Sequence, residues 1–287
     1  MTRAVFEQRL FGTLKWLSVV FFVVVTGFPL LYMVSLSFKK MSELLVEPGQ
    51  FLPTLADLTS LETYRAVLRP TAAGGQGFVL FIRNSVLLAL VTVIVTTTLA
   101  VFSAYAAARL RFRGKRAISS GILLVYLFPA IVIAIPLFVL FTRFGLRNLY
   151  GLVVVYLAQT IPVALYMLRS HFQTIPSSLE EAGLIDGLNR FGVIRRITLP
   201  LSAPAIAAVA LYVFMIAWNE FLLAFLFIVD KPALWTLPLG LQQLNSIEVP
   251  TTVLMAGSVI ISVPVIVLFF VAERFLTEGL TAGGVKG

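Results

Sequence analysis

The chain has 287 residues, of which 59% are hydrophobic and only 12% are charged. A soluble domain carries about 25% charged residues, so this composition leaves too little polar surface for a globule in water and indicates a lipid bilayer as the solvent. The net charge of +9 is typical of basic residues flanking membrane spans, and no basic stripe interleaved with aromatic residues indicates nucleic-acid binding. The chain has no cysteine and one histidine, His171, which excludes disulfides and metal clusters built from cysteine or histidine.

Six apolar stretches are long enough, at about 20 residues, to cross a bilayer as helices. They are 17–38, 84–108, 118–142, 149–168, 203–229 and 253–272. The first is too long for the apolar core of a secretory signal, and Phe38-Lys39-Lys40 follows it instead of a cleavage site, so we expect it to be retained. The sequence therefore predicts an all-α integral membrane protein with six transmembrane helices.

The loop 109–116 contains five basic and no acidic residues. This bias predicts that the loop is cytoplasmic. Alternation of the spans then places both termini and the loop 169–202 in the cytoplasm, and fourteen of the 22 basic residues lie on that side.

We expect four parts on this topology. They are an N-terminal segment with the first span (1–40), an external loop (41–83), a core of five helices (84–272) and a cytoplasmic tail (273–287). The glycine-rich run 74–77 predicts a flexible connector at the end of the external loop. Proline interrupts the interior of four spans, at Pro29, Pro129, Pro136, Pro162 and Pro264. This favours kinked helices around a wet pathway, although membrane helices also tolerate proline.

The loop 169–202 contains signals for two short helices. Pro176 ends the preceding segment, and Ser177 and Ser178 each precede a glutamate by three residues, which fits a capping box. Gly187 is expected to end the first helix, and Asn189 to cap the second. Apolar residues at Leu179, Ala182 and Ile185 share one face of the first helix, so the loop is predicted to be a docking surface.

The spacing Glu181-Ala182-Gly183-x3-Gly187-x9-Ile197-x-Leu199-Pro200 resembles the "EAA" loop of permease subunits of binding-protein-dependent ABC importers. The family pattern has alanine at the position of Gly183, which is also small. The resemblance implies that this loop docks in a groove of a cytoplasmic ABC ATPase dimer. It assigns the coupling role to Glu181, Ala182, Gly183, Asp186, Gly187, Arg190, Leu199 and Pro200.

Three further segments resemble the carbohydrate-specific, MalG-type branch of that family. They are 217–221 (Ala-Trp-Asn-Glu-Phe), 236–240 and the C-terminal segment 273–287. The resemblance implies the type I importer fold, a second homologous permease, an extracytoplasmic sugar-binding protein, and a disaccharide of the trehalose or maltose type as the substrate. It also implies a bacterial or archaeal cytoplasmic membrane.

No phosphate-binding loop of the form G-x4-G-K-[ST] is present, because the only Gly-Lys pair, at 114–115, lacks the first glycine and the hydroxyl. We therefore expect this chain not to be an enzyme and to hold no cofactor, with ATP and Mg²⁺ on a separate ATPase.

Polar residues in the spans are the candidates for the substrate pathway. Glu220 is the only acidic residue well inside a span, and Trp218 and Asn219 adjoin it. Carboxylate, amide and indole groups suit sugar hydroxyls and rings, but a structural hydrogen bond explains Glu220 equally well. Weaker candidates are Gln159 and Asn84. Gln242, Gln243 and Asn245, in an external loop, are candidate contacts for the binding protein.

Three other functions account for part of this pattern. A permease for glycerol phosphate or another polar solute would share the coupling loop. A self-sufficient secondary transporter would need ionisable relays within the spans, where only Glu220 qualifies. A membrane scaffold would explain the docking loop without explaining the interrupted spans.

Overall fold

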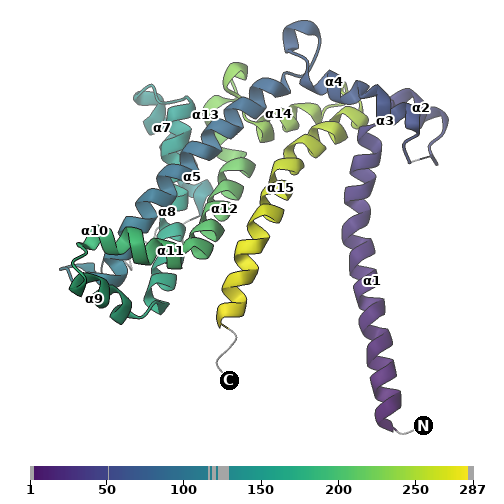
Figure 1. Cartoon of the computed structure of the whole chain (residues 1–287). Helices are drawn as coiled ribbons and strands as arrows, with labels where there is room; N and C mark the ends of the chain where they lie inside the picture. The colour runs from purple at the N-terminus through teal and green to yellow at the C-terminus, as the bar shows by residue number, and fades with distance from the viewer. Residues whose placement is uncertain (1–2, 51, 116, 118–120, 122–128, 284–287) are drawn as a thin grey trace. The chain divides into compact units, whose positions relative to one another are not determined.

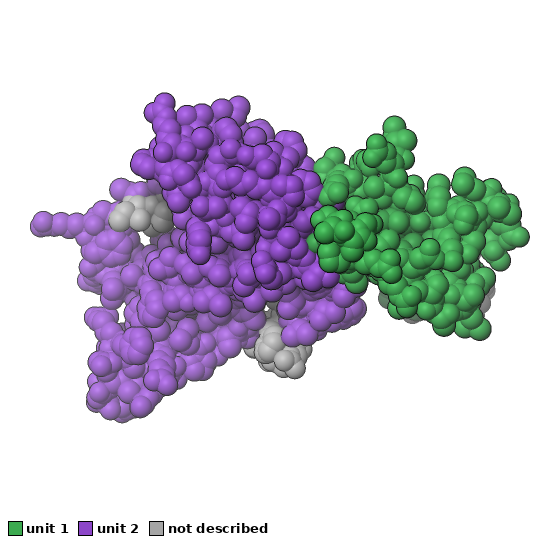
Figure 2. All heavy atoms as spheres, turned by 90° about the horizontal axis from the view of Figure 1, so that it is seen from above, with its two compact units in different colours: residues 1–78, 241–262 green, residues 79–240, 263–287 purple. Residues whose placement is uncertain are grey.

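The computed structural model describes residues 3–50, 52–115, 117, 121 and 129–283, and every regular element in that part of the chain is a helix. The chain forms two compact units, coloured separately in Figure 2. The first unit contains residues 1–78 and 241–262, and the second contains residues 79–240 and 263–287. Residues 241–262, which the sequence-based division assigns to the core, therefore belong to the first unit.

The first unit begins with a long apolar helix. Its elements are α1 (Arg3–Ser37), α2 (Met41–Val46), α3 (Leu55–Ser60), α4 (Glu62–Leu68) and η1 (Thr71–Ala73) (Figure 1). The most apolar 18-residue window of Leu10–Ser37 has a mean hydropathy of 2.3, and none of that window is buried within the protein. A helix that is apolar on all sides needs lipid or protein around it, which is expected of a membrane span.

The short helices after α1 are held by local hydrogen bonds. Thr54 and Asp57 form a capping box at the start of α3, and Leu61 turns the chain into α4 with a φ of 47°. The glycine-rich run 74–77, which composition predicts to be a flexible connector, folds back on α4. The backbone N–H groups of Gln76 and Gly77 donate to the carbonyls of Ala66 (3.0 Å) and Arg69 (2.8 Å).

The second unit contains most of the remaining helices. They are α5 (Phe78–Arg109), α7 (Ala130–Arg143), α8 (Leu149–Thr174), α9 (Ser177–Ile185), α10 (Arg190–Val193), η2 (Ile194–Thr198), α11 (Leu199–Leu201), α12 (Ala203–Asn219), α13 (Leu222–Ile228) and η3 (Pro232–Leu234). Two last helices, α14 (Leu237–Leu244) and α15 (Thr251–Gly283), contribute residues to both units.

Four of the described helices are long and apolar enough to cross a membrane, or five if the bent pair Arg190–Leu201 and Ala203–Asn219 forms one span. The predicted third span is 118–142, and residues 118–120 and 122–128 of it lie outside the described residues. The count of six spans therefore stays a prediction. The predicted fifth span, 203–229, is not continuous. It is divided into α12 and α13 because Glu220, between them, has an extended backbone.

A buried apolar cluster joins α5, α8, α12 and the segment 175–194. Ala100, Ala104, Leu168, Phe172 and Val213 are all fully buried in it. Ile175 and Ile194, from either end of the α9–α10 segment, belong to the same cluster. The inner side of the predicted docking loop thus packs against the helical core.

The two ends of α5 hold different parts of the second unit. At one end, the Asn84 amide donates to the carbonyls of Ala233 (3.1 Å) and Trp235 (3.0 Å). At the other end, Arg109 binds Glu180 of α9 at 2.9 Å. The 25 residues between these contacts span about 37 Å in an α-helix, which exceeds the bilayer hydrocarbon core of about 30 Å.

Candidate functional site

The α9–α10 segment lies at the Arg109 end of α5 (Figure 1). The predicted capping box is wrong, because Pro176 precedes α9 and no side chain caps the helix. Glu180, one of the two glutamates of the predicted capping boxes, instead binds the guanidinium of Arg109. A charged partner gives that carboxylate a stronger hydrogen bond than a backbone amide would.

Gly187 and Asn189 form the joint between the two short helices. Gly187 has a φ of 87°, a region that an L side chain rarely adopts, and this conformation ends α9. The Asn189 side chain accepts a hydrogen bond from the Gly192 N–H at 2.8 Å and caps α10, as the sequence predicts.

The close helix approach in this segment occurs at Gly183. A Cβ atom there would lie 2.5 Å from Cδ1 of Ile197, whereas nothing lies within 4 Å of the same position on Gly187. The backbone conformation therefore favours glycine at 187, whereas packing against Ile197 requires only a small residue at 183.

The outer side of the segment carries exposed apolar side chains beside charges. We call Leu179, Leu184, Ile185 and Phe191 the docking face; their exposed fractions are 45, 42, 86 and 60%. Among the predicted coupling residues, Gly183 is buried and Leu199 is half-buried. The exposed ones are Glu181, Ala182, Asp186, Gly187, Arg190 and Pro200. Exposed apolar groups rimmed by charges are typical of a surface that binds another protein.

Glu220 occupies the break between α12 and α13. Its Oε1 accepts from the Leu223 N–H (2.7 Å), and its Oε2 accepts from the Ala224 N–H (3.0 Å) and the Tyr156 hydroxyl (3.0 Å). The carboxylate therefore satisfies the first amides of α13, where the helix dipole favours negative charge. This geometry favours the structural alternative for Glu220 over direct sugar contact.

The two residues before Glu220 lie in different surroundings. The Trp218 side chain is 1% exposed, and its ring lies 5.2 Å from that of Phe214 in a stacked arrangement. Asn219 is exposed, and its amide nitrogen donates to the Met215 carbonyl at 2.8 Å. Of the three predicted pathway residues in this run, Asn219 alone presents its side chain at the surface of the chain.

The remaining pathway candidates are not gathered around Glu220. Asn84 is 1% exposed and holds the segment 233–235. Gln159 is half-buried on α8, next to Thr160, whose hydroxyl lies 2.7 Å from that of Thr96 on α5. These contacts join neighbouring helices, which is a packing role common in membrane bundles.

The predicted binding-protein contacts lie on and just after α14. Gln242, Gln243 and Asn245 are all exposed. The Gln243 amide donates to Gln76 at 3.5 Å, so α14 touches the folded glycine-rich run.

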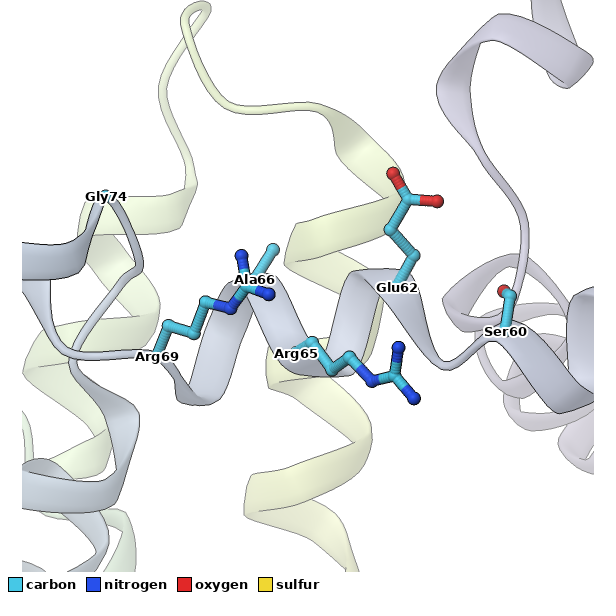
Figure 3. Close-up of a pocket in the computed structure, with 6 residues that line it drawn as sticks. All are labelled: Ser60, Glu62, Arg65, Ala66, Arg69 and Gly74. Carbon is cyan, nitrogen blue, oxygen red and sulfur yellow. The ribbon is translucent and has the colours of Figure 1, made fainter.

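Sequence reasoning did not single out the surface of α4. Ser60, Glu62, Arg65, Ala66, Arg69 and Gly74 line an open hollow of about 500 Å³ there (Figure 3). Lys40 binds Glu62 at 2.7 Å, and this ion pair lowers the pKa of Glu62 and raises that of Lys40. Mixed charges of this kind are typical of a solvated face.

Sequence reasoning also missed the partners of Glu180. Arg109 and Tyr105 bind its carboxylate from 71 and 75 residues away along the chain, and no local periodicity reports such a pairing. Among the described residues, no group of three or more histidine, cysteine or acidic side chains is placed to hold a metal ion.

Residues 96–280 match the family model described as the binding-protein-dependent transport system inner membrane component. The inner membrane ABC transporter permease protein YcjP of Escherichia coli is 38% identical over 93% of both chains. The trehalose transport system permease protein SugB of Mycobacterium tuberculosis is 34% identical over 90% of this chain and 92% of that protein.

A third relative covers nearly the whole chain. The trehalose/maltose transport system permease protein MalG of Thermococcus litoralis is 33% identical over 98% of this chain and 99% of its own length. A solved bacterial ABC transporter involved in the import of the acidic polysaccharide alginate has a chain with the same fold, with a TM-score of 0.79, 24% identity and coverage of 96% of this chain and 98% of its own. The chain belongs to the family of binding-protein-dependent transport system inner membrane components, the permease subunits of ABC importers.

Proposed function

We propose that this chain is a permease subunit of an ATP-driven importer of a sugar, most simply a disaccharide of the trehalose or maltose type. It forms the translocation pathway together with a second, homologous permease in a bacterial or archaeal cytoplasmic membrane. Relatives that are named for trehalose and maltose transport, and that align over nine-tenths or more of both chains, support the choice of substrate class.

One observation carries the coupling role. The α9–α10 segment exposes its docking face, while Ile175 and Ile194 at its base are buried in the helical core. A segment with exposed apolar side chains on its outer side and buried residues at its base suits a subunit contact that must transmit movement. In this proposal the segment binds a separate ATPase, which holds ATP and Mg²⁺, and this chain hydrolyses nothing.

The sidedness of the chain follows from the same proposal. The docking face and both termini lie in the cytoplasm, and the loops 39–83 and 230–252 lie outside. Gln242, Gln243 and Asn245 then face an extracytoplasmic sugar-binding protein. Asn219 is the side chain best placed to meet the sugar, because it is polar, exposed and located within the broken fifth span.

The test is co-purification from the native membrane, followed by ATPase measurements with and without sugar-loaded binding protein. We expect a second permease, an ATPase and a binding protein to purify with this chain, and the loaded binding protein to raise ATP turnover. Purification of the chain alone, with transport that needs no ATP, would overturn the proposal in favour of a secondary transporter.

A further inference from the structure

Glu180 differs from its neighbours on α9 in its surroundings. Its exposed fraction is 6%, whereas Leu179, Glu181 and Ala182 on either side of it are exposed. A carboxylate that is removed from water loses hydration, and it is retained in a fold only where charged or hydrogen-bonding partners replace that water.

The partners of Glu180 come from two other segments. Arg109 Nε donates to Oε1 at 2.9 Å, and the Tyr105 hydroxyl donates to Oε2 at 3.1 Å, both from α5. The Thr198 hydroxyl, at the end of η2, lies 3.5 Å from Oε1. We call these four residues the Glu180 cluster.

Arg109 extends the cluster to a third segment. Its Nη2 donates to the carbonyl of Ile175 at 2.6 Å, and Ile175 is the residue that caps the end of α8. One guanidinium thus binds the start of the docking segment through Ile175 and the middle of α9 through Glu180. The Arg109 side chain is only 15% exposed, so this pair is shielded from competing solvent.

The chemistry of these contacts differs from that of the apolar core beside them. Apolar burial is non-directional, so it constrains the orientation of a segment less than a hydrogen bond does. A guanidinium that donates two hydrogen bonds in a fixed plane resists sliding and rotation. A buried ion pair is also weak evidence for added stability, because desolvation offsets its attraction. The cluster is therefore better suited to fixing geometry than to increasing stability.

We propose that Glu180 and Arg109 form a positioning link that makes α9 and the adjoining end of α5 move as one body. A displacement of the docking face by the ATPase is then passed directly to α5, a helix long enough to cross the membrane. This inference rests on the proposed function, and it separates two adjacent glutamates: Glu181 contacts the partner, and Glu180 transmits the movement.

Distances measured in the assembled transporter test the link directly. The chain has no cysteine, so Ser103→Cys on α5 and Ser178→Cys on α9, both at exposed positions, can carry spin labels without background. We expect the label-to-label distance to be the same with and without ATP in the otherwise unchanged chain. With Glu180→Gln added, we expect ATP to shift or broaden that distance. A nucleotide-dependent distance in the unchanged pair, or none in the Glu180→Gln pair, would overturn the link.

Transport in proteoliposomes gives the second measurement. We expect Glu180→Gln to leave ATPase association intact and to raise the ATP hydrolysed per sugar transported by about tenfold, within the range of coupling between sites. Glu181→Gln should instead weaken association with the ATPase. Arg109→Gln and the Glu180→Gln/Arg109→Gln double variant should match Glu180→Gln, because two partners of one link do not contribute additively. Arg196→Gln, which removes an exposed charge from the same loop, is the control and should leave the ratio unchanged.

If the Glu180→Gln chain fails to assemble, the conservative variant Tyr105→Phe tests the link instead. It removes one hydrogen bond to Oε2 and keeps the ring in the core, so we expect a smaller rise in ATP per sugar. An unchanged ratio in this variant, or additive effects of the Glu180 and Arg109 substitutions, would overturn the link. Failure of the unchanged chain to bind any ATPase would overturn the proposed function itself.

Discussion

At the scale of single residues, two glycines four positions apart have different physical requirements. Gly183 is limited by the terminal methyl group of Ile197, and Gly187 by its positive φ. A Cβ atom at Gly187 would meet no neighbour within 4 Å, so the close helix approach in this segment occurs at Gly183.

Substitution of the two glycines separates these effects. Gly183→Ala should be nearly neutral, because the flexible end of Ile197 can move aside, and alanine is what the resembled family pattern has there. Gly187→Ala should cost about 1–2 kcal/mol in unfolding free energy, since alanine is forced into a left-handed conformation. Thermal unfolding of the two purified variants measures the difference, and equal midpoints would contradict it.

Glu220 and Asn219 allow a similar comparison within the broken span. Glu220→Ala should destabilise the protein by about 1–2 kcal/mol, because the Leu223 and Ala224 amides lose their cap. Asn219→Ala should leave stability unchanged and lower sugar uptake, because that side chain is exposed. The measurements are unfolding in detergent and uptake in vesicles. A stable Glu220→Ala protein that fails to transport would instead restore the sugar-contact alternative for Glu220.

At the scale of elements, the α9–α10 segment has an outer side for docking and an inner side for anchoring. Phe191 and Ile194 lie three residues apart in this segment, yet Phe191 is 60% exposed and Ile194 only 8%. Phe191 and Ile194 therefore belong to different contacts, the first with a partner in the proposed function and the second with the core.

Truncation of each residue should have a distinct result. Phe191→Ala and Ile185→Ala should each weaken ATPase binding by about 2 kcal/mol, as expected for anchors at an interface centre, without changing stability. Ile194→Ala should lower stability by about 2–5 kcal/mol through the cavity it leaves. Affinity capture of the ATPase and thermal unfolding, compared across the three variants, check both effects. Unaltered ATPase binding by Phe191→Ala and Ile185→Ala would contradict the position of the docking face.

At the scale of the whole molecule, the proposed topology places the docking face in the cytoplasm and the loop 230–252, which contains α14, outside. Within the second unit, Asn84 near one end of α5 binds Ala233 of that loop, and Arg109 at the other end binds Glu180 of α9. These contacts agree with the proposed topology. Sidedness can be measured because the chain has no cysteine of its own.

Single cysteines at exposed serines report the side. We expect Ser246→Cys, just after α14, to react with a membrane-impermeant thiol reagent in intact cells. Ser178→Cys, on α9, should react only after the membrane is opened. Labelling of Ser178→Cys in intact cells would reverse the topology and remove the basis for a cytoplasmic ATPase contact.

The sequence by itself determined the membrane class, most of the apolar helices, the joint at Gly187 and Asn189, and the family. These features depend on composition, on runs of about 20 apolar residues, and on local backbone preferences, all of which a linear sequence contains. The exposed apolar positions on α9 also follow from helical spacing, which is a local property.

Only the tertiary structure decided which way the polar side chains point and what they bind. Glu180 pairs with Arg109 across 71 residues, Asn84 holds carbonyls 149 and 151 residues away, and Glu220 caps a helix that hydropathy merges with the preceding one. Hydropathy measures how apolar a segment is, and it does not register where a single carboxylate interrupts the backbone ladder. Contacts between distant segments exist only after the helices pack, so a buried charge and an exposed one, such as Glu180 and Glu181, are the same residue type in the sequence and differ only in the fold.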